Sequence, residues 1–235
     1  MGKSFLRLII VGSISLTILL VVAVLAIPTA ANALTLVQTS DPGWYNNSLG
    51  TVLNSTNGGE TGPFPVSDDA YRAFASAPDL SAASFALGNW LTDPLDLNAN
   101  WSYLTSIPNG WAVGTEVAVM YQFDTLGATN VVAQFGVDNG IFVWLDGIYL
   151  GGSRAAGSYY LGEHTYNVGD LSAGTHFLQL LLEDHGVTNG YAVRITADTY
   201  TPGPPPVSSV PEPASLLLFG SSIAGLFLLK RKTQL

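Results

Sequence analysis

The chain has 235 residues, a formal net charge of −9 and no cysteine. Without cysteine there are no disulfides or thiolate metal sites, so packing alone must hold the fold together. Between residues 34 and 209 only Arg72, Arg154 and Arg194 are basic, against sixteen Asp and Glu, which gives this part a balance of −13. Such a surface repels phosphate backbones, and it excludes nucleic-acid binding.

Residues 1–33 have the parts of a secretory signal peptide. Lys3 and Arg7 precede an apolar run from Leu8 to Ile27, and Ala31 and Ala33 form an A-x-A end. We expect export through the Sec translocon and cleavage after Ala33. Because the apolar run over 8–27 is longer than the usual central region of about 7–15 residues, an uncleaved N-terminal anchor is the alternative.

Residues 34–83 are rich in Gly, Pro, Asn, Ser and Thr, which favours short strands joined by long loops. Short apolar pieces occur at 34–37 and 50–53. Alanine and leucine are frequent over 79–91, and this composition predicts a short helix.

From residue 97 onward the pattern favours strands, with turns expected at Asp138-Asn139-Gly140 and at Asp146-Gly147. The predicted strands are 116–123, 131–137, 141–145, 148–150, 164–168, 175–182 and 191–197. Short strands at this spacing, separated by Gly and Asx turns, predict a single all-β sandwich over 34–200. Several strands are apolar at consecutive positions, so we expect parts of them to be covered on both faces.

Seven short pieces occur in order within residues 97–200. They are Asn100-Trp101, Tyr121-Gln122-Phe123, Val137-Asp138-Asn139-Gly140, Val143-Trp144-Leu145-Asp146-Gly147, Tyr149-Leu150-Gly151, Tyr166 to Leu171 and Gly174 to Leu178. This order resembles the galactose-binding-like jelly roll of sugar-binding modules that accompany glycoside hydrolases. The resemblance implies a jelly-roll β-sandwich. That family often has Asn where this chain has Asp146, so sugar binding is not carried over from that position.

Glu183, Asp184 and His185 form the densest polar cluster, at the end of an apolar strand. Carboxylates and an imidazole at a loop are suited to bind Ca²⁺ or a sugar hydroxyl. The alternative is a turn in which Asp184 accepts hydrogen bonds from backbone amides. No cofactor is expected apart from the alternative of Ca²⁺, and the histidines lack the spacing of a zinc site.

Trp90, Trp101 and Trp111 lie near predicted turns, which makes them candidates for surface platforms that stack on sugars, whereas Trp144 lies within a strand and is expected in the core. No nucleophile-elbow or phosphate-loop motif occurs, and no pair of carboxylates lies in a recognisable glycosidase motif. The sequence therefore predicts a protein without enzymatic activity.

The end of the chain has a distinct composition. Four prolines within 201–209 predict a stiff linker, and Pro211, Glu212 and Pro213 then precede an uncharged apolar run over 216–229 that ends at Lys230-Arg231-Lys232. The run is short for a membrane span, which usually needs about twenty residues. Because basic residues stay on the cytoplasmic side, we expect a C-terminal transmembrane helix with the body outside the inner membrane. A plain tail anchor is the alternative.

The order of these three parts within 210–235 resembles the PEP-CTERM sorting signal of exported proteins in Gram-negative bacteria that make exopolysaccharide. The resemblance implies that an exosortase recognises Pro211, Glu212 and Pro213. The leading hypothesis is an exported cell-envelope or extracellular-matrix β-sandwich that binds carbohydrate weakly. The alternatives are a purely structural surface protein without a ligand and, third, a glycan-active enzyme.

Overall fold

The structure is a computed structural model, and it describes residues 33–53, 71–155, 158–184, 186 and 188–203. The expected signal helix, the C-terminal transmembrane helix and the sorting residues Pro211, Glu212 and Pro213 lie outside these residues. Within the described part of the chain, no helix is long and apolar enough to cross a membrane.

The described residues are mostly strand, which confirms the all-β prediction. The helical elements are a single 3₁₀ turn, η1 (Ser81–Ala83), and α3 (Ser84–Leu87), where a short helix was predicted. The strands are β1 (Leu34–Gln38), β2 (Gly43–Gly50), β3 (Arg72–Phe74), β4 (Ser102–Leu104), β5 (Glu116–Leu145), β6 (Ile148–Ala155), β7 (His164–Leu171), β8 (Gly174–Glu183), β9 (Gly190–Ala197) and β10 (Thr199–Pro202).

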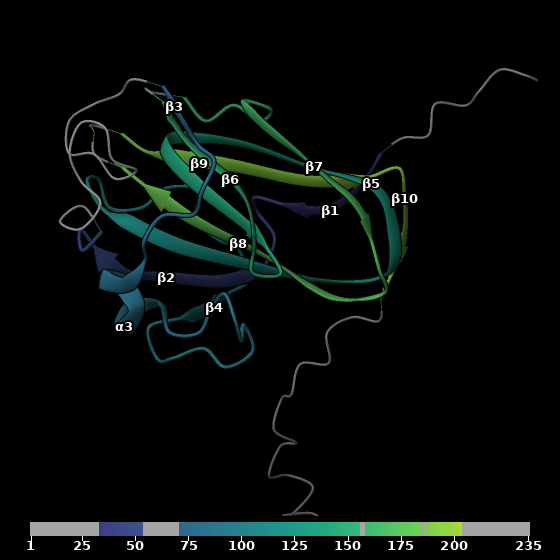
Figure 1. The fold of residues 1–235 in the computed structure, drawn as a ribbon, viewed down its shortest axis with the longest axis horizontal. Coiled ribbons are helices and arrows are strands. Elements are labelled where there is room, and N and C mark those ends of the chain that lie inside the picture. Colours follow the sequence, from purple (N-terminus) through teal and green to yellow (C-terminus); the bar gives the residue numbers. More distant parts are fainter. Residues whose placement is uncertain (1–32, 54–70, 156–157, 185, 187, 204–235) are drawn as a thin grey trace, which may run out of the picture.

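The 30-residue strand β5 organises the sandwich (Figure 1). Its first arm, 116–125, and its last arm, 140–145, both pair antiparallel with β8, one on each side. Its middle section, 128–138, pairs instead with β7 and β9. The chain therefore passes from one layer to the other and back without leaving the sheet.

The pairings define two layers. In the first layer the order is β4, β2, the first arm of β5, β8, the last arm of β5, β6 and β3. In the second layer the order is β7, the middle of β5, β9 and β1.

The predicted turn at Asp138-Asn139-Gly140 is wrong, because β5 continues through these residues. A turn would pair the strand after it with the strand before it. Here Gly140 to Leu145 pair with β6 and β8, so the chain bends between the layers and does not reverse. The turn predicted at Asp146-Gly147 is confirmed, with Asp146 at a φ of 52°.

Two hydrophobic cores lie on the two faces of the first layer. Val117, Val119 and Tyr121 point into the core between the layers, whereas the alternating Ala118 and Met120 point into an outer core. Alternate residues of a strand face opposite sides, so β5 is apolar at every position of this stretch. The expectation that strands are covered on both faces is confirmed.

The outer core is closed by the segment that contains α3, which brings its tryptophans inward. Trp144 is buried, as predicted, and its ring centroid lies 5.7 Å from that of Trp90. Trp90 and Trp101 were predicted at the surface, and this prediction is wrong, since they are only 2% and 8% exposed. The apolar outer face of the first layer would otherwise face water, and large aromatic rings are an effective cover.

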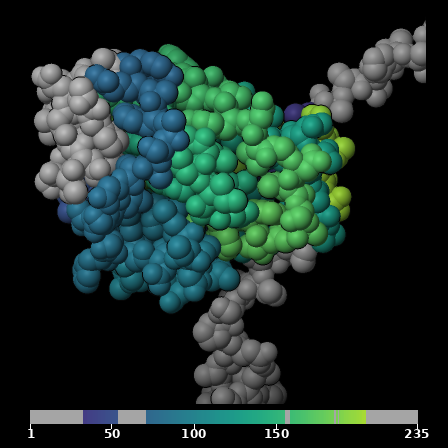
Figure 2. Space-filling model, viewed as in Figure 1, coloured from purple at the N-terminus to yellow at the C-terminus, as the bar shows by residue number. Residues whose placement is uncertain are grey.

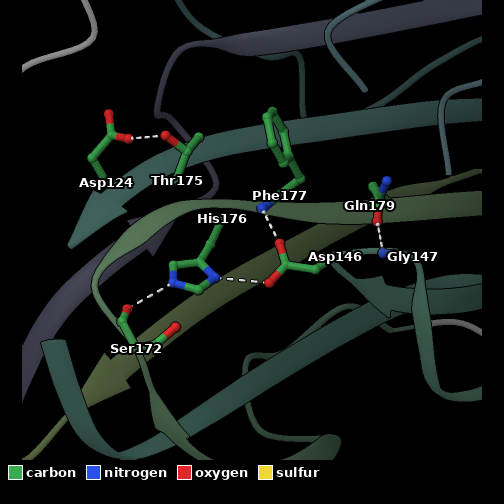
Figure 3. Close-up of polar contacts among 8 residues, drawn as sticks. All are labelled: Asp124, Asp146, Gly147, Ser172, Thr175, His176, Phe177 and Gln179. Carbon is green, nitrogen blue, oxygen red and sulfur yellow. Dashed lines mark hydrogen bonds and ion pairs between the residues drawn. The ribbon is translucent and has the colours of Figure 1, made fainter. Parts of the chain in front are cut away.

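The β5–β6 hairpin is fastened to β8 by side chains (Figure 3). Asp146 accepts a hydrogen bond from the backbone N–H of Phe177 at 2.8 Å, and its other oxygen lies 2.7 Å from Nδ1 of His176. Nε2 of His176 lies 3.0 Å from the carbonyl oxygen of Ser172. His176 therefore stabilises the turn at Asp146-Gly147.

Gln179, also on β8, joins this hairpin to the covering segment. Its Oε1 accepts from the backbone N–H of Gly147 at 2.8 Å, and its Nε2 donates to the carbonyl of Trp90 at 2.6 Å. The side chain is fully buried. Gln179 thus supplies hydrogen-bond partners to two buried backbone groups, at the point where the Asp146-Gly147 turn, β8 and the segment that contains α3 meet.

The linker predicted over 201–209 begins later than expected. Thr201 and Pro202 belong to β10, in which Pro202 lies opposite Thr125 of β5. The folded part therefore includes at least residue 202.

Candidate functional site

A pocket of about 280 Å³ opens at the end of the sandwich where β6 and β8 end and where β7 and β9 begin. We call it the end pocket, and it is lined by Asp138, Ser158, Tyr159, Tyr160 and Thr188. The residues come from three separate segments, namely the bend of β5, the β6–β7 connection and the approach to β9. Together they supply a carboxylate, two aliphatic hydroxyls and two phenols.

The two tyrosines are accessible yet firmly placed. Tyr159 and Tyr160 are 45% and 79% exposed. The ring of Tyr159 lies against Gly190, so closely that an added Cβ there would come within 2.6 Å of the ring carbon Cε1. The backbone of the same two residues lies directly over Gly136. One side of the Tyr159 ring is thus supported by the sheet, which leaves accessible aromatic surface for a ligand.

Glu163 fixes the loop that carries these tyrosines. Its Oε1 accepts from the backbone N–H of Tyr160 at 3.1 Å and from the hydroxyl of Ser158. Its Oε2 accepts from the backbone N–H of Val137 at 3.2 Å. The loop is therefore tied to β5 next to Asp138.

Asp138 provides the carboxylate of the end pocket. It is 5% exposed, and its two oxygens accept from Nδ2 of Asn139 at 2.9 Å and from the hydroxyl of Thr188 at 3.3 Å. A carboxylate beside aromatic rings is a combination that binds sugars, because it accepts from hydroxyls while a ring contacts the apolar C–H face.

The predicted polar cluster lies next to this pocket and is largely buried. Asp184 is 2% exposed, and it accepts hydrogen bonds from the backbone N–H groups of Gly114 and Gly186. Asp184 therefore makes the contacts that the alternative interpretation expects, in which it accepts hydrogen bonds from backbone amides. Glu183 is 1% exposed at the end of β8, and His185 lies outside the described residues.

Glu183 has a second buried carboxylate beside it. Glu116, which is 1% exposed, is its cross-strand neighbour on β5. Burial, followed by the charge of Glu183, raises the pKa of Glu116 to about 8. On the other side of Glu183, the same row continues through Gly140 and Arg154 to Arg72.

None of the three predicted tryptophan platforms lines the end pocket. The indole N–H of Trp101 donates to the carbonyl of Leu87 at 3.0 Å inside the outer core. Trp111 is half-buried near the pocket, where its backbone N–H donates to Oδ1 of Asn189 at 2.9 Å, one residue beyond Thr188.

The residues that line the end pocket were missed because three distant segments form it. The sequence carried one signal, which is the adjacent pair Tyr159-Tyr160 in a loop of small residues. No three His, Asp or Glu side chains within the described part of the chain converge to hold a metal ion.

A larger hollow, of about 610 Å³, lies over β1 and β9. Its lining includes Arg194 but no aromatic residue. It offers no stacking surface, so the end pocket is the better candidate for a ligand with hydroxyl groups and apolar C–H faces.

Residues 209–232 match the PEP-CTERM protein-sorting motif, which confirms the resemblance seen in the tail. No curated protein sequence matches the chain. The motif marks the chain for export to the cell envelope or beyond.

Solved structures give distant similarities. They include a PA14 sugar-binding domain from an RTX adhesin (13% identity, 49% of this chain and 63% of that one, TM-score 0.29). A β-glucuronidase of Bifidobacterium dentium is 10% identical over 70% of this chain and 30% of its own, with a TM-score of 0.36. The PA14 domain of the MpAFP antifreeze protein is 15% identical over 71% of this chain and 88% of its own, with a TM-score of 0.31. Similarity at this level establishes neither a shared ligand nor a shared activity.

Proposed function

We propose that this protein is exported across the inner membrane, sorted by an exosortase through Pro211, Glu212 and Pro213, and binds neutral sugar units of envelope or extracellular polysaccharide in its end pocket. The observation that carries the binding proposal is the pair Tyr159 and Tyr160 placed beside the carboxylate of Asp138. Aromatic rings and a carboxylate at one opening match the two kinds of surface that a sugar presents.

A binding role without catalysis is supported by the position of the acids. Glycoside hydrolysis needs two carboxylates that reach the same bond. Glu116 and Glu183 are cross-strand neighbours, but each is 1% exposed and neither lines the end pocket. Asp138 is the pocket's single carboxylate among the described residues.

The binding proposal is tested by measuring retention of the full chain on immobilised neutral polysaccharides such as dextran, galactomannan and β-1,3-glucan. Tyr160→Ala is expected to weaken binding about tenfold, which corresponds to about 1.4 kcal/mol. Gly190→Ala is expected to do the same, because the added Cβ displaces the Tyr159 ring without removing it.

Tyr103→Ala is the matched control, because Tyr103 is 59% exposed and lies on β4, outside the pocket. Each protein is measured with Ca²⁺ and with a chelator, which tests the alternative that Ca²⁺ takes part. If the parent protein is not retained on any polysaccharide under either condition, the binding proposal is wrong and the structural role without a ligand is left.

The sorting proposal has a separate test. Replacing Pro211 and Glu212 together is expected to leave an unprocessed, membrane-held form on a blot of fractionated cells. Identical processing of the variant and the parent protein would contradict recognition by an exosortase.

A further inference from the structure

A third hollow, of about 400 Å³, lies on the side of the sandwich where the layers meet at β6 and β7. We call it the side groove, and its lining includes Tyr71, Phe74, Gly151, Glu163, His164 and Tyr166. Figure 2 shows the blue surface that includes β3 beside the teal and green surface of β6 and β7. The groove thus combines residues from both layers.

Part of the side groove is formed by an aromatic ring that packs directly on a glycine. The phenol of Tyr166, on β7, lies over Gly151 of β6, where an added Cβ would be 2.5 Å from a ring carbon. Gly151 has a φ of +155°, which favours glycine at this position. Tyr71, also in the lining, is 67% exposed. The groove therefore presents aromatic surface with little side-chain obstruction beneath it.

The polar groups of the side groove are largely neutral. Ser153 is 2% exposed, and its hydroxyl lies 3.0 Å from Nε2 of His164. Burial lowers the pKa of His164, so its ring is neutral at neutral pH and offers one donor and one acceptor. Such groups suit the hydroxyls of an uncharged sugar.

The side groove and the end pocket share one segment as a wall. Glu163 lines the groove, and the same carboxylate accepts from Tyr160 and Ser158, which line the end pocket. The end pocket, at about 280 Å³, is at the lower limit of small-molecule pockets, which span about 300–1,000 Å³. It has room for a single small unit, and a longer ligand has to continue elsewhere.

We propose that the end pocket and the side groove are two subsites for one neutral polysaccharide chain, so that the protein binds an internal stretch of polymer more tightly than a single sugar. This inference rests on the proposed function of the end pocket. The balance of −13 over residues 34–209 disfavours uronic-acid and sulfated polymers, whose charge would be repelled.

The test is calorimetry of the full chain with oligosaccharides, from monosaccharide to hexasaccharide. They are prepared from the immobilised neutral polysaccharide that retains the protein. Affinity is expected to rise about tenfold or more with length. Tyr71→Ala is expected to abolish this gain while leaving monosaccharide affinity unchanged. Tyr160→Ala should weaken every length alike, and Tyr103→Ala should change none. Alginate and polygalacturonate are expected to bind weakly or not at all.

Tyr71 is exposed, so its loss should leave the fold intact, and thermal unfolding of each variant checks this. If the parent protein binds all lengths equally, or if Tyr71→Ala weakens the monosaccharide as much as the hexasaccharide, the two-subsite inference is wrong while the end pocket stands. If no saccharide of any length binds, the proposed function itself fails.

Discussion

Replacing Glu116 with glutamine is expected to stabilise the protein at mildly alkaline pH. Glu116 is buried, and its nearest charged neighbour across the strands is another carboxylate, Glu183. The arginine of the row, Arg154, lies on β6, on the far side of Glu183 from Glu116. Among the described residues, nothing hydrogen-bonds Oε2 of Glu116. The site therefore favours the protonated carboxyl, which glutamine resembles.

The size of the effect follows from proton linkage. The folded protein keeps the proton on Glu116 until about pH 8, whereas the ordinary pKa that the unfolded chain would show is 4.5. The folded state binds more protons between these values, so its stability is full below about pH 4.5 and falls as the pH rises toward 8. At about 1.36 kcal/mol per pH unit, the loss is at most about 5 kcal/mol. We expect about 2–3 kcal/mol, because a buried ion recruits water when it forms.

The assay is urea unfolding of the parent protein and of Glu116→Gln at pH 5 and at pH 8, followed by near-UV circular dichroism. The two proteins should have similar stability at pH 5, and the variant should be more stable by the stated amount at pH 8. Asp93→Asn is the control, since it removes the same charge from an exposed position. If Glu116→Gln loses stability in parallel with the parent protein up to pH 8, the argument from Glu116 is wrong.

Two further perturbations test the polar contacts inside the fold. Gln179→Leu should lower the free energy of unfolding by about 2–3 kcal/mol, because the backbone groups of Gly147 and Trp90 lose their partner; an unchanged urea midpoint would contradict this. Burial raises the pKa of Tyr121 and of Tyr191, whose hydroxyls lie 2.6 Å apart. Neither phenol should therefore ionise near pH 10 until the protein unfolds, and Tyr191→Phe should remove one late-titrating phenol from the ultraviolet absorbance titration.

Much of the strand pattern could be predicted from the sequence, because apolar and β-branched runs end at glycine or Asx residues. The prediction was wrong at Asp138-Asn139-Gly140, where the same residue types permit a bend within one strand. Local sequence does not distinguish a glycine that ends a strand from one that admits a neighbouring side chain. At Gly140 that neighbour is Glu183, whose carboxylate lies where a Cβ would be.

The site was less predictable than the fold, since its residues meet only after the layers close. Trp101 was expected at the surface because it lies near a turn, but the apolar outer face of the first layer draws it inward. Conversely, Tyr159 and Tyr160 had no motif around them, and their support comes from Gly136 and Gly190 on other segments. The sorting signal was predictable in full, because it is a linear motif that needs no tertiary structure.

The position of β8 between the two arms of β5 determines the order in which the first layer can form when the chain is released N-terminus first. Both arms of β5 precede Gly174 in the chain, so β8, which pairs between them, emerges after both. Until Glu183 has crossed, each arm exposes an unpaired edge with apolar side chains on both sides. If the chain is exported unfolded, the first layer can close only after β8 has followed, and until then the edges of both arms are open to pairing with other chains.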